Sequence, residues 1–221
     1  MNENDLIEEY KEYIGNKAFP CVAARAALSR QQIQYLVVDH MACPKDDVKI
    51  LTFMYNFVAE YRQSEELFLS AVILFKGPEL PNENLFDTLL WQRLQSLADL
   101  DARQHPYDQR VAPDPNAANF SFSLKEEAFF VIGLHPNSSR PARRFSYPAL
   151  VFNPHAQFEQ MRETEGYAKM QNIVRKRDLA YSGSINPMLT DYGTASEVYQ
   201  YSGRQYDTTW TCPLKINHAA A

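Results

Sequence analysis

An apolar run followed by a cluster of arginines is the segment of this sequence best suited to chemistry. The run from Phe129 to Leu134 leads directly into His135. Arginine binds carboxylates through two parallel hydrogen bonds, and Ser139 with nearby backbone N–H groups could supplement such contacts. Ligand-binding groups are often placed in loops that follow strands. The arginines of this loop are Arg140, Arg143 and Arg144, and we expect them to hold up to two carboxylates.

Two histidines each follow a predicted strand. His135 comes after the first apolar run, and His155 follows Asn153-Pro154 after a second one. Both could point into one pocket, although a histidine at the end of an element is more often a hydrogen-bonded structural residue. The sequence contains no HExxH motif and no His or Cys pair at short ligand spacing, so zinc is not expected.

The three cysteines are widely spaced at Cys21, Cys43 and Cys212, which fits reduced thiols better than a disulfide framework. Cys21 follows Pro20 at the start of a predicted helix. A helix N-terminus lowers the pKa of a thiol and favours a nucleophile or a soft metal ligand. A small buried apolar residue is the commoner role of such a cysteine.

Composition indicates one globular domain over residues 1–221, with 45% hydrophobic and 22% charged residues. No window reaches the roughly 20 apolar residues of a membrane helix, and the acidic start is unlike a secretory signal, so we expect a cytoplasmic protein. The net charge of −5 argues against nucleic-acid binding. Residues 140–177 nevertheless carry eight Lys/Arg against three Asp/Glu, which suits a small anion or a solvated basic helix.

Hydrophobic periodicity predicts a mixed α/β fold, with a central mixed sheet flanked by helices and a long ordered loop region at the C-terminal end. Helices are expected at 5–13, 22–28, 47–62, 85–100 and, as one helix or an interrupted pair, at 155–177. Strands are expected at 34–39, 67–75, 120–122, 128–134 and 149–152. The proline-rich segment 105–119 is a loop, long enough to act as a lid. No glycine-rich nucleotide motif is present.

Several segments, taken in order, resemble the YqcI/YcgG family over most of the chain. The pieces that carry the resemblance include Phe19-Pro20-Cys21, Gly133-Leu134-His135-Pro136, Asn153-Pro154-His155, Gln200-Tyr201-Ser202-Gly203-Arg204 and Trp210-Thr211-Cys212-Pro213. The chain looks most similar to the branch of heme-dependent enzymes that hydroxylate a nitrogen of an amino acid or a guanidine.

This resemblance implies heme b, a small amino-acid or guanidine substrate, and dioxygen with an external electron donor or redox partner, or else peroxide. Heme requires apolar walls, basic groups for its propionates and an axial ligand for its iron. The resemblance then assigns the arginine cluster and Ser139 to cofactor binding, and His155 with Arg204 to catalysis. His135 is the preferred iron ligand, with His155, Cys21 and Cys212 as alternatives.

Two other classes of function remain open from the sequence. The same arginines could serve a non-catalytic protein that binds heme or a small anion. Alternatively, Cys21 with a histidine could act as the nucleophile of a hydrolase or transferase. The first would bind its ligand without turnover, and the second would need no iron.

Overall fold

The computed structural model describes residues 2–162, 166–189 and 193–217. Its centre is a five-stranded sheet with the order β1-β2-β5-β4-β3. β1 and β2 are parallel, whereas the other neighbouring strands are antiparallel, so the sheet is mixed as predicted. The strands are β1 (Ile33–His40), β2 (Ser70–Gly77), β3 (Phe122–Leu124), β4 (Glu127–Leu134) and β5 (Ala149–Pro154).

Helices cover both faces of this sheet. They are α1 (Glu3–Gly15), α2 (Val22–Ser29), α3 (Asp47–Tyr61), α4 (Glu83–Asp101), α5 (His155–Arg162), α6 (Gly166–Ser182) and α7 (Val198–Tyr201), with short 3₁₀ turns at Pro44–Asp46 and Pro141–Arg143. Asparagine caps set two of the starts: Asn2 forms a capping box with Asp5, and the side chain of Asn82 accepts from the backbone N–H of Leu85. None of the described helices is long and apolar enough to cross a membrane.

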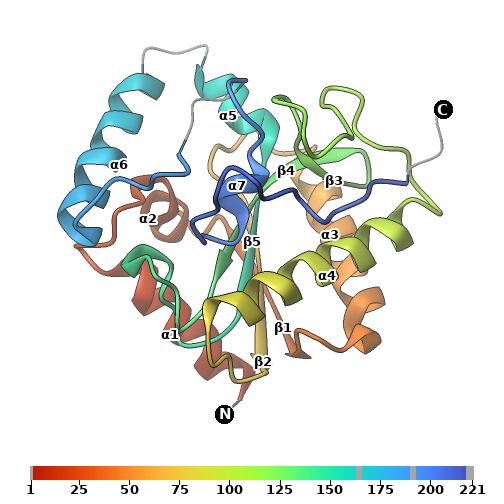
Figure 1. Ribbon diagram of the computed structural model, residues 1–221, viewed down its shortest axis with the longest axis horizontal. Coiled ribbons are helices and arrows are strands. Elements are labelled where there is room, and N and C mark those ends of the chain that lie inside the picture. The colour runs from red at the N-terminus through yellow and green to blue at the C-terminus, as the bar shows by residue number, and fades with distance from the viewer. Residues whose placement is uncertain (1, 163–165, 190–192, 218–221) are drawn as a thin grey trace.

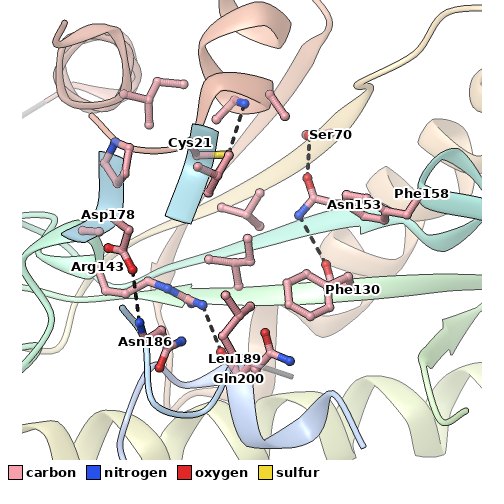
Figure 2. Close-up of a pocket in the computed structure, with 18 of the residues that line it drawn as sticks. Cys21, Ser70, Phe130, Arg143, Asn153, Phe158, Asp178, Asn186, Leu189 and Gln200 are labelled. Atoms are coloured by element: carbon pink, nitrogen blue, oxygen red, sulfur yellow. Dashed lines mark hydrogen bonds between the residues drawn. The ribbon is translucent and has the colours of Figure 1, made fainter. Parts of the chain in front are cut away.

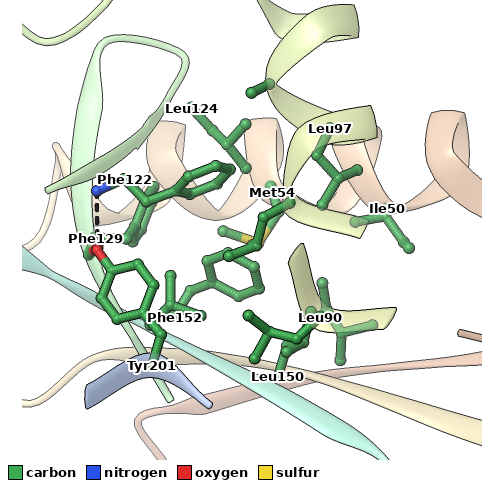
Figure 3. Close-up of a cluster of buried hydrophobic side chains, with 14 of the residues drawn as sticks. Ile50, Met54, Leu90, Leu97, Phe122, Leu124, Phe129, Leu150, Phe152 and Tyr201 are labelled. Carbon is green, nitrogen blue, oxygen red and sulfur yellow. Dashed lines mark hydrogen bonds between the residues drawn. The ribbon is translucent and has the colours of Figure 1, made fainter. Parts of the chain in front are cut away.

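The larger apolar core lies between the sheet and the α3–α4 pair (Figure 1). Met54 of α3, Leu90 of α4 and Phe152 of β5 meet there, beside Phe122 and Phe129 (Figure 3). Burial of such side chains contributes about 1.5–3 kcal/mol each. The α3–α4 side of the sheet is therefore filled by apolar side chains. A site for a ligand is to be sought on the other face.

The opposite face carries α1 and α2, with α6 beyond them (Figure 1). A second apolar cluster joins Leu6, Tyr10 and Ile14 of α1 to Val72 and Leu74 of β2. These α1 residues recur every four positions and so lie on one helical face. These contacts pack α1 against the sheet. The rest of this face of the sheet borders a cavity.

The predicted elements are confirmed, with shifts at their ends. The predicted strand 67–75 begins only at Ser70, because Phe68 adopts a positive φ of 71° that an extended strand excludes. The strand expected at 120–122 occupies Phe122–Leu124. The helical segment expected at 155–177 comprises α5 and α6, and the residues between them, 163–165, lie outside the described part of the chain. The proline-rich loop packs Tyr107 and Val111 into the larger core, so it does not form a lid over the cavity described below.

Candidate functional site

A cavity of about 360 Å³ lies between the sheet and the helices α1, α2 and α6. Its sheet wall is made by Phe130, Ile132 and Leu134 of β4 and by Val151 and Asn153 of β5 (Figure 2). Alternate residues of a strand face one side, which explains why every second residue of these strands reaches the cavity. The volume is at the lower end of the roughly 300–1,000 Å³ typical of small-molecule pockets.

The helical walls are mostly apolar. Ile14 of α1, Ala23 and Ala24 of α2, and Met170 and Val174 of α6 all line the cavity. The alanines leave space because their side chains end at Cβ. The cavity thus offers an apolar lining in which a few polar groups can orient a ligand.

Arg143 is a partly buried cation in the cavity wall. Its guanidinium donates to the carbonyl oxygens of Gly133 and Gln200 at 3.0 Å each and to that of Tyr201 at 3.4 Å. Gly203, with a positive φ of 82°, lets the chain after α7 pass close to the Arg143 side chain, where a Cβ would lie 3.2 Å from its Cγ. Burial lowers the pKa of Arg143 to about 10. Among the described residues, no carboxylate lies within ion-pair distance of it.

Arg140, by contrast, has a counter-ion. Its guanidinium lies 2.6 Å from a carboxylate oxygen of Asp178 and 3.1 Å from the carbonyl oxygen of Ser184. The backbone N–H of Asn186 donates to the same carboxylate at 3.3 Å. Both Arg140 and Asp178 line the cavity. Within the described residues, this end of the cavity therefore holds Arg140 with a carboxylate partner and Arg143 with carbonyl partners. Figure 2 shows Arg143 and Asp178 at this end.

Cys21 lines the same cavity and is the N-cap of α2. Its sulfur accepts a hydrogen bond from the backbone N–H of Ala24 at 3.4 Å. Burial raises the pKa of the thiol, while backbone N–H groups at the start of α2 and the charge of Arg143 oppose that rise. A bound metal ion would deprotonate such a thiol despite the burial.

His155 begins α5 and lines the cavity beside Glu197, which sequence reasoning missed. Nδ1 of His155 lies 3.4 Å from Oγ of Ser121, and burial lowers the pKa of the imidazole to about 4. Ser121 donates to Oε1 of Glu197 at 2.8 Å, and Tyr201 donates to the same oxygen at 2.5 Å. Burial raises the pKa of Glu197 to about 8. A neutral histidine and a buried carboxyl group thus stand side by side.

The structure does not bring His135 to this cavity. Its side chain is fully buried and stacks on Phe86 of α4 with ring centroids 4.3 Å apart. Nε2 lies 3.9 Å from Oε1 of Glu83, and neither ring nitrogen has a hydrogen-bond partner among the described residues. Our preference for His135 as an iron ligand in this cavity therefore does not fit the geometry.

Two of the predicted cofactor-binding residues also point elsewhere. The hydroxyl and backbone N–H of Ser139 both donate to Glu83 at 3.0 Å. Arg144 donates to the carbonyl oxygens of Ser138 and Ser139 at 2.6 and 3.3 Å. Neither residue lines the cavity, because the 3₁₀ turn Pro141–Arg143 turns Arg143 inward and leaves these side chains bonded within the loop and to α4.

Arg204 and Cys212 lie on the α4 side of the molecule. Arg204 pairs with Asp87 of α4 at 3.3 Å and stacks over Tyr206, so the predicted catalytic role is not supported by its position. Cys212 packs against the larger core, where burial raises the pKa of its thiol to about 12. Among the predicted site residues, the cavity collects Arg140, Arg143, Cys21 and His155.

Comparison with known proteins decides the family. The model of the YqcI/YcgG family matches residues 10–215. The chain belongs to the YqcI/YcgG family. It is also 28% identical over 198 residues to the uncharacterized protein YqcI of Bacillus subtilis (strain 168), an alignment covering 86% of this chain and 77% of that relative. No solved structure matches the chain. The family resemblance predicted from the sequence is confirmed, and its heme-dependent branch remains a proposal.

Proposed function

We propose that this protein is a heme-dependent monooxygenase that hydroxylates an amino or guanidino nitrogen of a small amino-acid-like substrate. The observation that carries the proposal is the guanidinium of Arg143, partly buried at the wall of an apolar cavity that also contains a thiol and an imidazole. Among the described residues the hydrogen-bond partners of Arg143 are carbonyl oxygens, so an anionic ligand group beside it would form a charge-assisted hydrogen bond.

The donor set fits heme. Apolar side chains of β4, β5, α1 and α6 would contact the flat macrocycle, and Arg143 with Arg140 would face a propionate or the substrate carboxylate. Iron in heme needs only an axial protein ligand, which is consistent with the described residues holding no cluster of three His, Cys, Asp or Glu side chains. Bound heme would supply the activation of dioxygen or peroxide.

We assign the axial position to Cys21 rather than to a histidine. Burial raises the pKa of the Cys21 thiol, but the backbone N–H of Ala24 and the charge of Arg143 oppose that rise, and bound iron would deprotonate the thiol. His155 directs Nδ1 toward Ser121 and Glu197, and Nε2 lies 3.6 Å from Glu159, so both nitrogens face oxygen atoms of the protein. His155 would therefore be better suited to a catalytic role than to binding iron.

The chain's own residues would then position the substrate and exclude water. Arg143 would orient an anionic group, and the apolar walls would keep competing water away from the reacting nitrogen. His155 is neutral at physiological pH because burial lowers its pKa to about 4, so it would present an uncharged ring to the substrate at the cavity wall. The electrons would come from an external donor or redox partner, or peroxide would replace both dioxygen and the electrons.

Arg143 also favours a second candidate, a non-catalytic protein that binds heme or a small anion. The two candidates share the ligand contacts and differ only in turnover. The third possibility, a hydrolase or transferase with Cys21 as nucleophile, gains little support, because burial raises the pKa of the thiol and its hydrogen bond comes from a backbone N–H group.

The test combines binding and turnover. Heme-loaded protein with a chemical reductant and dioxygen, or with peroxide, is offered amino acids, diamines and guanidines, and mass spectrometry follows the addition of one oxygen atom. We expect substrate-dependent oxygen uptake with an N-hydroxylated product, and loss of substrate or heme affinity in Arg143→Met but not in the control Arg144→Met. Heme binding without product from any substrate would favour the non-catalytic candidate.

A further inference from the structure

Glu197 is a carboxyl group held at the cavity wall, immediately before α7. Its side chain is 8% exposed, and Oε1 accepts hydrogen bonds from Ser121 at 2.8 Å and Tyr201 at 2.5 Å. Tyr201 is itself fully buried, and its hydroxyl also accepts from the backbone N–H of Phe122 at 3.1 Å. These contacts fix the orientation of the carboxyl group through Oε1. The other oxygen, Oε2, does not take part in them.

Oε2 of Glu197 faces His155, with 3.9 Å to Nδ1. The other ring nitrogen of His155, Nε2, lies 3.6 Å from Oε1 of Glu159. The side chain of Glu159 is 42% exposed, whereas that of His155 is 4% exposed. The three groups are therefore successive neighbours, from the exposed Glu159 through His155 to Glu197 at the cavity wall. Catalytic contacts are often this long in the absence of substrate and shorten on binding.

Burial favours the uncharged form of both inner groups. Burial raises the pKa of Glu197 to about 8. Hydrogen bonds from Tyr201 and Ser121 and the charge of Arg162 have the opposite, smaller effect on this pKa. Burial also lowers the pKa of His155 to about 4. Tyr107, from the proline-rich loop, is the other titratable neighbour that interacts with Glu197, and it stays a neutral phenol because burial raises its pKa. At neutral pH, Glu197 thus holds a proton that His155 does not take.

We propose that Glu197 is the proton donor of the cavity and that Glu159 and His155 reload it from solvent. The inference rests on the proposed function, because hydroxylation of a nitrogen with dioxygen consumes two protons and two electrons and forms one water besides the product. The external donor supplies the electrons. Delivery breaks the O–H bond of Glu197 and leaves a carboxylate. Glu159 then passes a proton to Nε2 of His155, and His155 releases another proton from Nδ1 to Glu197. This transfer restores the carboxylic acid of Glu197.

Glu197→Gln tests the proposal, since glutamine keeps an acceptor for Ser121 and Tyr201 but holds no acidic proton. Glu83→Gln is the matched control: Glu83 also lies 3.9 Å from a histidine nitrogen, that of His135, but outside the cavity. Infrared spectroscopy of the protein without heme should show the C=O stretch of a buried carboxylic acid at neutral pH. That band should vanish in Glu197→Gln, persist in Glu83→Gln, and disappear in the wild type as pH rises through about 8.

Turnover gives the second measurement. Heme-loaded Glu197→Gln should keep the wild-type Soret band and substrate affinity, while the rate of product formation falls about 100-fold and reduced oxygen escapes as peroxide. Glu83→Gln should behave as wild type. No carboxylic acid band at neutral pH, or full product yield in Glu197→Gln, would overturn the inference alone. No Soret band in the wild type would overturn the proposed function, and with it the need for this proton.

Discussion

The buried imidazole of His135 makes the stability of this protein depend on pH. The side chain is fully buried against Phe86, and its pKa falls from 6.5 to about 4 because burial disfavours the charged form. The folded state therefore holds a neutral ring where the unfolded chain binds a proton. The resulting stability is complete above about pH 6.5 and is lost as pH falls from there toward about 4.

The size of this loss follows from the two pKa values. One unit corresponds to about 1.4 kcal/mol, so the full shift is worth about 3 kcal/mol, and about 2 kcal/mol of it disappears between about pH 7.5 and about pH 5. His155 has a shift of similar size, and Glu197 has one of opposite sign for stability. Both groups contribute equally to the wild type and to a variant at His135, so they cancel in the comparison.

The variant His135→Leu isolates this contribution, because leucine fills a similar space without a titratable group. Urea unfolding of both proteins at the two pH values gives four free energies. We expect the difference between pH 7.5 and pH 5 to be about 2 kcal/mol smaller in the variant than in the wild type. An equal pH dependence of the two proteins would refute the description of His135 as a neutral, buried ring that lacks a hydrogen-bond partner among the described residues.

Three further substitutions test the core, the ion pair and the cavity. Gly133→Ala would place a Cβ 2.7 Å from carbon atoms of Leu90 and Phe86, so urea unfolding should show a loss of about 1–3 kcal/mol; an unchanged midpoint would contradict this packing. Asp178→Asn leaves Arg140 without its counter-ion and should cost about 3–5 kcal/mol, whereas a loss below about 1 kcal/mol would show the pair to be solvated. Ile132→Trp fills the cavity, so heme titration should show at least a tenfold loss of affinity with the far-ultraviolet spectrum retained, and unchanged affinity would place the ligand elsewhere.

Much of the fold could be predicted because its elements have clear periodicity. The apolar residues of α3 recur at helical spacing, and β2 is a continuous apolar run covered on both faces. The errors lie at ends, where a single backbone conformation decides, as at Phe68. A positive φ is uncommon for residues other than glycine, so a phenylalanine in the sequence gives little indication of one.

The site was harder to predict because it depends on which side of the sheet each residue faces. Phe130, Ile132 and Leu134 alternate toward the cavity, while Gly133 faces Phe86 of α4, and His135 joins it on that side. This period of two was present in the sequence and could have separated His135 from the cavity. The inward turn of Arg143 depends on contacts with residues far along the chain and left no local signal.

Glu197 illustrates the other kind of omission. It is the only acidic residue between 193 and 206, and Val198, Tyr199 and Tyr201 follow it closely. A lone carboxylate in such a setting is a candidate for burial and a raised pKa. What the sequence could not provide is its neighbour His155, which the fold brings from the end of β5.

We propose that the cavity holds heme with Cys21 as the iron ligand. The most direct measurement is the visible spectrum of protein reconstituted with one equivalent of heme, including the ferrous carbon monoxide form, for the wild type, Cys21→Ser and His135→Ala. The account predicts a Soret band with thiolate character in the wild type and His135→Ala, and loss of that character in Cys21→Ser. No Soret band in the wild type would contradict the claim of heme, and a thiolate spectrum that survives Cys21→Ser would contradict the ligand.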